Sequence, residues 1–112
     1  MADQVGAKIA YQSAGTGAES VSLTDPVKQL AIENYHATQL LYARVFTGAT
    51  AAAALAKADA TDAVAAADEN WFIAPGTRKV VLKTTRPIYA AVSLIASGAS
   101  TTCVVEGTDF RD

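Results

Sequence analysis

Apolar and polar residues alternate along much of this chain, which is the period-two pattern of half-buried β-strands. In "VKQLAIEN" (27–34), Leu30 and Ile32 fall on one face, and Gln29 and Glu33 fall on the other. A strand with one buried face and one solvated face is the simplest structure that fits this spacing.

The next segment, "TQLLYARVFTG" (38–48), keeps the same alternation but has two apolar faces. Leu41, Ala43 and Val45 share one face. The opposite face is too apolar to lie against water alone, so we expect something to cover it. That opposite face consists of Leu40, Tyr42, Arg44 and Phe46.

Four further strands are predicted in the second part of the chain, with turn residues between them. In the second of them, Val80 and Leu82 should point inward, and Lys79 and Lys83 outward. Strands that recur at such short intervals are typical of an antiparallel β-sandwich. The predicted fold is therefore mainly β, a jelly-roll-like or Ig-like sandwich of seven to eight strands. The four segments are "NWFIA" (70–74), "RKVVLKTT" (78–85), "PIYAAVSLIA" (87–96) and "STTCVVEG" (100–107).

Two segments interrupt this pattern. Residues 1–26 are rich in small residues and predict a partly extended N-terminal arm, with strands near 7–12 and 19–23. Residues 27–112 then form a single sandwich domain. Between 51 and 67, eleven of seventeen residues are alanine, so a helical insert is expected at about 50–67 with Thr50 as its N-cap.

The stretch "NWFIAPGTRKVVLK" raises the question of a binding site. Trp71 and Phe72 are adjacent, so in a strand they point to opposite faces, and we expect one ring in the core and the other at an edge or interface. Pro75 and Gly76 occupy the second and third positions of "APGT", which suits a type II turn and a corner rather than a tight hairpin.

Charge is spread unevenly along the 112 residues. Nine basic and eleven acidic residues give a net charge of −2, so we expect no binding to nucleic acid or to an anionic membrane. No leader-like or membrane-spanning apolar run is visible, and neither export by such a signal nor anchoring is expected. Four basic residues nevertheless cluster within a short stretch. They are interpreted either as ordinary solvated charges or as a contact for an acidic surface of another protein. They are Arg78, Lys79, Lys83 and Arg86.

Candidate chemistry is sparse. The single histidine, His36, could in principle pair with the single cysteine, Cys103, but a mid-strand thiol is more often a small core residue. One His and one Cys do not supply the ligands of a zinc site, and "SAGTG" lacks the lysine of a phosphate-binding loop. We therefore expect no enzyme activity, no metal site and no cofactor.

The order of "YARVFTG", an Ala-rich insert, "APGTRKVV", "RPIYAAVSLIASG" and "TTCVVEGTDF" resembles small β-sandwich structural proteins of tailed bacteriophages. That group includes capsid cement, decoration and head–tail proteins. The resemblance implies a virion protein made in the bacterial host cytoplasm. Its partners would be the major capsid protein or other virion subunits, and it would form a homo-oligomer such as a trimer.

The resemblance favours a capsid cement or decoration protein at subunit junctions, and a head–tail connector or tail protein is the nearest alternative. A carbohydrate-binding module that uses Trp71 or Phe72 is a third hypothesis. The candidate interface residues are Tyr42, Arg44, Phe46, Trp71, Phe72, Arg78, Lys79, Lys83 and Arg86.

Overall fold

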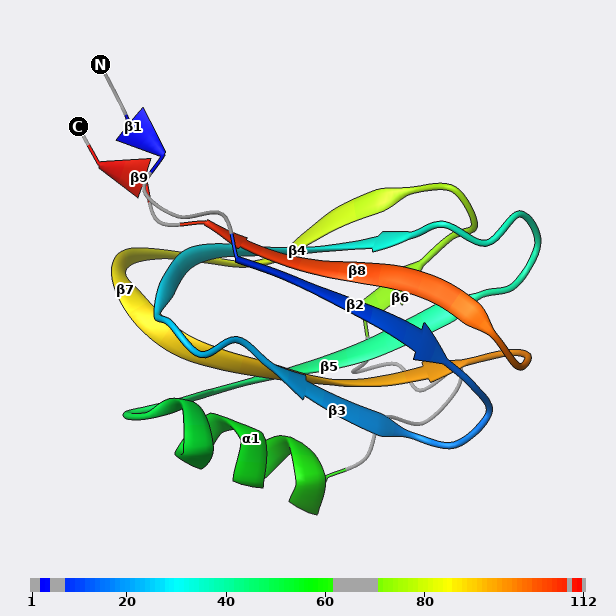
Figure 1. Cartoon of the computed structure of the whole chain (residues 1–112), viewed down its shortest axis with the longest axis horizontal. Helices are drawn as coiled ribbons and strands as arrows, with labels where there is room; N and C mark the ends of the chain where they lie inside the picture. Colours follow the sequence, from blue (N-terminus) through cyan, green and yellow to red (C-terminus); the bar gives the residue numbers. More distant parts are fainter. Residues whose placement is uncertain (1–2, 5–7, 62–70, 109, 112) are drawn as a thin grey trace.

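The computed structural model describes residues 3–4, 8–61, 71–108 and 110–111. Antiparallel strands dominate these residues, and one short helix lies outside the strands (Figure 1). The mainly β class predicted from the alternating pattern is therefore confirmed. The elements are β1 (Asp3–Gln4), β2 (Lys8–Ala14), β3 (Glu19–Ser22), β4 (Val27–Asn34), β5 (Leu41–Gly48), α1 (Ala51–Ala60), β6 (Trp71–Ile73), β7 (Arg78–Ala96), β8 (Thr101–Thr108) and β9 (Phe110–Arg111).

Most strands belong to one seven-stranded sheet, in the order β2-β8-β4-β7-β5-β6, and β3 pairs with β7 beside this path. Every pairing is antiparallel. A separate two-stranded pair, β1 with β9, projects from one end (Figure 1). The jelly-roll-like or Ig-like arrangement of these strands stays a prediction.

Strand β7 is the element that organises the sheet. The sequence predicted two strands separated at Arg86, but the structure has one strand of 19 residues that bends sharply in Figure 1. Its first part pairs with β4, and its second part lies between β5 and β3. Pro87 falls in the break of the β4 register between Lys83 and Ile88, where its missing N–H is tolerated because no residue of β4 is paired with it.

The bend divides the sheet into two halves that enclose one core. The first half is β2, β8, β4 and the first part of β7, and the second half is β3, the second part of β7, β5 and β6. Both halves contribute to a single cluster of buried apolar side chains, whose removal from water stabilises the fold. Its largest fully buried apolar members are Leu30, Ile32, Leu41, Ile73, Leu94, Val27, Val92 and Val105.

The N-terminal segment is part of this sheet. The strands expected near 7–12 and 19–23 correspond to β2 and β3, which pair with β8 and β7. Ala14 and Val21 are buried in the common core. Residues 8–23 therefore pack with the sheet that the sequence analysis assigned to 27–112, and do not form a separate arm.

Helix α1 is shorter than the insert expected at 50–67, because it ends at Ala60, and residues 62–70 lie outside the described part. The predicted N-cap is confirmed, since the Thr50 hydroxyl accepts a hydrogen bond from the backbone N–H of Ala53 at 3.1 Å. Ala54 and Ala58 are fully buried and pack with Phe46 and Ala91. The helix thus covers part of the apolar outer face of β5, as expected for that face.

Candidate interaction surface

The short edge strand β6 carries the two aromatic residues that the sequence singled out. Among the strands that the structure describes it pairs with β5 alone, and its last residue, Ile73, is fully buried opposite Leu41. Trp71 and Phe72 are 42% and 41% exposed. The prediction that one of these rings is a core residue is therefore wrong, because β6 lies at the margin of the sheet and only Ile73 reaches the core.

The two rings lie on opposite faces of β6, in keeping with the alternation. Phe72 is opposite Tyr42 on β5, and their ring centroids are 5.5 Å apart with the planes tilted by 38°. Trp71 is opposite the buried Ala43, on the face of Ile73. The rings therefore contact different neighbours and do not form one flat platform.

Lys79 connects β6 to the start of β7. Its Nζ donates a hydrogen bond to the carbonyl oxygen of Phe72 at 2.7 Å. The same ammonium lies 6.0 Å from the ring centroid of Trp71, at the outer limit of a cation–π contact. One basic side chain therefore holds the edges of the two sheet halves together beside an exposed aromatic ring.

The connection between β6 and β7 is a type II turn, as predicted. The N–H of Thr77 donates to the carbonyl of Ala74 at 3.2 Å, and Gly76 has a φ of 70°, which an L side chain adopts rarely. The backbone of Asn34 brackets the turn, because its N–H donates to Thr77 and its carbonyl accepts from Gly76, each at 2.9 Å. The turn is a corner between the second and first halves of the sheet.

Val80 is 39% exposed, although the alternation placed it inward. The register with β4 shifts at this point: Leu30 is opposite Leu82, but Ala31 is opposite Val80, so Val81 is an extra residue in β7. Such a β-bulge reverses the facing of the residues beyond it. Val81 is consequently buried, and Val80 joins the exposed apolar residues. We call Tyr42, Trp71, Phe72, Lys79 and Val80 the corner surface, a name for the residues on both faces of β5, β6 and the start of β7 near the turn at Gly76.

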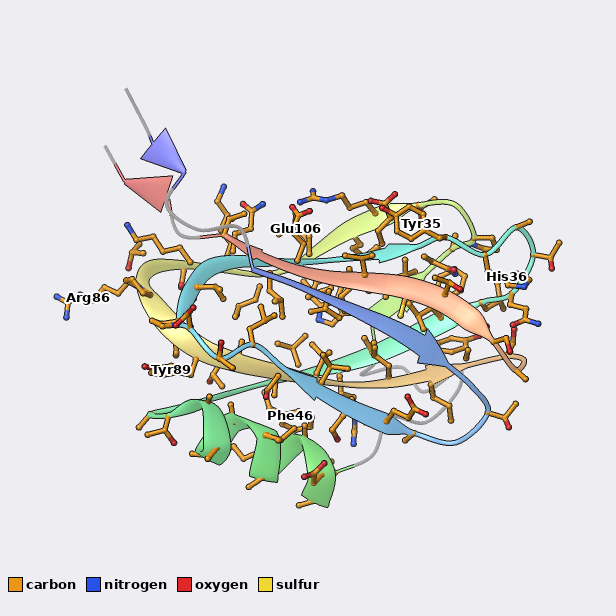
Figure 2. The ribbon with its side chains drawn as sticks, in the orientation of Figure 1. Tyr35, His36, Phe46, Arg86, Tyr89 and Glu106 are labelled. Carbon is orange, nitrogen blue, oxygen red and sulfur yellow. The ribbon has the colours of Figure 1, made fainter. Side chains whose placement is uncertain are left out.

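The other predicted interface residues lie elsewhere. Arg78 forms an ion pair with Glu106 on β8, with a nitrogen–oxygen distance of 3.0 Å. Phe46 lies between the sheet and α1 (Figure 2), and Arg86 projects at the bend of β7. Lys83 is exposed on β7, and Arg44 is half-buried on β5. The nine candidates therefore do not form one patch.

Cys103 and His36 are engaged separately. Burial, together with the negative charge of Glu19, raises the pKa of the Cys103 thiol to about 11, against a lowering contribution from a backbone hydrogen bond to Ala14. Nδ1 of His36 accepts the backbone N–H groups of Thr38 and Gln39 at 3.1 and 3.0 Å. A buried neutral thiol and an imidazole nitrogen occupied within its own loop do not make a nucleophile–base pair.

Within the described ranges, no pocket is present and no group of three or more His, Cys, Asp or Glu is placed to hold a metal ion. None of the described helical residues forms a helix long and apolar enough to cross a membrane. No family model, curated protein or solved structure matches the chain.

Sequence reasoning missed two exposed apolar residues, Val80 and Tyr35. Tyr35 is 56% exposed and directly follows β4, in the loop that leads to His36 (Figure 2). Its position at a strand end was a usable signal, because strand ends lie at the surface. The exposure of Val80 depends on the bulge, for which the sequence around it contains no glycine or other marker.

Proposed function

We propose that this chain is a non-enzymatic virion structural protein, specifically a capsid cement or decoration protein that binds the phage head at subunit junctions. The observation that carries the proposal is the corner surface, where Trp71, Phe72 and Val80 are each about two-fifths exposed. Large apolar side chains that are exposed in this way on both faces of β6 and at the start of β7 gain free energy when another subunit covers them. The sequence resemblance supplies the setting in which such a subunit is found.

The proposed partners are the major capsid protein or other virion subunits, together with further copies of this chain. Lys79 places a polar group beside the exposed rings, in keeping with the polar rim that surrounds the apolar part of a protein interface. Aromatic residues contribute much of the binding energy at such interfaces. We therefore expect Trp71 and Phe72 to contribute most to attachment.

Mass spectrometry of purified virions tests the proposal. A decoration protein should be present in hundreds of copies, whereas about a dozen copies in a ring would favour the connector alternative. Absence of the chain from the particle would overturn both. In a reconstitution with particles stripped of this chain, Phe72→Ala should reduce binding, and Tyr89→Ala, at the distant bend in Figure 2, should leave it unchanged.

A carbohydrate-binding module is the remaining alternative. Trp71 is exposed, as a sugar-binding ring must be, but Phe72 points to the opposite face of β6 and is tilted by 38° against Tyr42. A sugar would therefore stack on a single ring. A change in Trp71 fluorescence on addition of members of a glycan panel would favour this alternative over the virion proposal.

A further inference from the structure

The first part of β7 is paired along only one of its sides. Its residues from Arg78 to Lys83 pair with β4, whereas the residues after Tyr89 have β5 on one side and β3 on the other. In the described part of the chain, no strand runs along the second side of residues 80–85. This segment is therefore an open strand edge, with backbone groups available to a further strand.

The open edge is also positively charged. From Trp71 to Val105 the chain contains no Asp or Glu. Arg78 is neutralised by Glu106, and Lys79 is bound to Phe72, but Lys83 and Arg86 are exposed and form no ion pair with any described residue. A strand that pairs with residues 80–85 would run beside these two positive charges.

We propose that the open edge of β7 binds an extended acidic segment of another protein, which adds a strand to the first half of the sheet. Main-chain hydrogen bonds would supply affinity, as in other cases of strand addition. Carboxylates near Lys83 and Arg86 would supply selectivity. The inference rests on the proposed function, because it names the chemistry of the partner, but it is tested on the isolated protein.

A second copy of this edge is a poor occupant. Antiparallel pairing of two copies would bring Lys83 and Arg86 of each to one ladder without a carboxylate to pair with them, and like charges on paired strands are destabilising. The bulge at Val81 and the proline at Pro87 shorten the edge and further disfavour indiscriminate pairing. The same basic residues would attract the carboxylates of an acidic strand.

The probe is a blocked eight-residue peptide of alternating Glu and Val, added to the isotope-labelled full chain. Nuclear magnetic resonance should show shifts confined to residues 80–85 and their β4 neighbours, and slower amide exchange at 80–85. We expect the matching Lys–Val peptide to bind at least tenfold more weakly. Lys83→Glu should weaken binding of the Glu–Val peptide about tenfold, and Lys57→Glu on α1 is the matched control.

Three outcomes would overturn the inference: no binding at millimolar peptide, equal binding of the two peptides, or shifts confined to Trp71 and Phe72. Protection of 80–85 that depends on protein concentration without peptide would instead identify a second copy as the occupant. Each of these results leaves the virion test of the proposed function untouched, so failure of one can be told from failure of the other.

Discussion

The side-chain amide of Asn34 donates a hydrogen bond to the carbonyl oxygen of Ile73, 39 residues later in the chain, at 3.2 Å. The same amide donates to the carbonyl of Gln39 at 2.9 Å, and its oxygen accepts the N–H of His36 at 3.0 Å. Asn34 is fully buried, and with its backbone bonds to the corner turn it joins β4, β6 and the loop between β4 and β5. This residue fixes the position of the corner surface.

Replacement of Asn34 by Ala should lower the free energy of unfolding by about 2–4 kcal/mol, because it leaves buried backbone groups without partners. Urea denaturation measures the change. Thr38→Ala is the control, since Thr38 is exposed and contributes its backbone N–H, and it should alter stability by less than about 0.5 kcal/mol. A loss at Asn34 no larger than this would contradict the role assigned to it.

Truncation of the smaller side chain, Ile73, should destabilise the protein more than truncation of the larger one, Trp71. Ile73→Ala removes a fully buried side chain and should cost about 2–5 kcal/mol. Trp71→Ala removes a partly exposed ring and should cost less than about 2 kcal/mol. Unfolding measurements on both variants, with iodide quenching of Trp71 fluorescence in the parent, provide the check. Protection of Trp71 fluorescence from iodide would contradict the exposed position of the ring.

Gly107 has no room for a side chain. A Cβ there would lie 2.5 Å from Leu23 Cδ1 and 2.5 Å from Val27 Cγ1. Gly107→Ala should therefore destabilise the protein by about 1–3 kcal/mol through overpacking. Gly17 is the matched control, because a Cβ there meets nothing within 4 Å. Thermal unfolding should separate the two variants clearly, and equal melting temperatures would argue against this packing.

The ion pair between Arg78 and Glu106 should contribute little, because the two side chains are 41% and 33% exposed. A double-mutant cycle with Arg78→Gln and Glu106→Gln should give a coupling free energy of about 0.2–1 kcal/mol, which decreases as salt is added. A coupling that is large and independent of salt would mean that the pair is shielded from solvent.

Cys103 should resist thiol reagents in the folded protein. Its pKa is raised from 9.0 to about 11, so the folded state keeps the proton that the unfolded state loses. Stability linked to this thiol is fully present below pH 9 and decreases as pH rises toward about 11. At pH 8, an aromatic disulfide reagent should label Cys103 only as fast as the protein unfolds. Cys103→Ser is the unreactive control. Fast labelling under native conditions would contradict this burial.

The strand pattern predicted most of the strands, because alternation marks extended segments even where both faces are buried. Ala90, Val92 and Leu94 share the face of β7 that meets the common core, and Ala91 and Ser93 between them are buried as well, Ala91 against α1. The position of Val80 was not predictable in the same way. Its facing depends on the insertion of Val81 opposite β4, and a bulge of this kind is set by pairing between distant strands rather than by local sequence.

The candidate site was predicted only in part. Alternation correctly separated Trp71 from Phe72, but it could not show that β6 is an edge strand, and edge position decides burial. Phe46 and Trp71 were both among the candidate interface residues, although α1 covers Phe46 and leaves Trp71 exposed. Burial by another element is a tertiary property that spacing along one strand does not contain.

Since β7 runs without interruption from Arg78 to Ala96, the two halves of the sheet share one backbone. A load applied at the corner along the axis of β7 would therefore act on its hydrogen bonds with β5 and β3 in shear, and would not unzip them one at a time. A subunit attached at this corner would be anchored to the whole domain, and detachment under force would require its two halves to yield together.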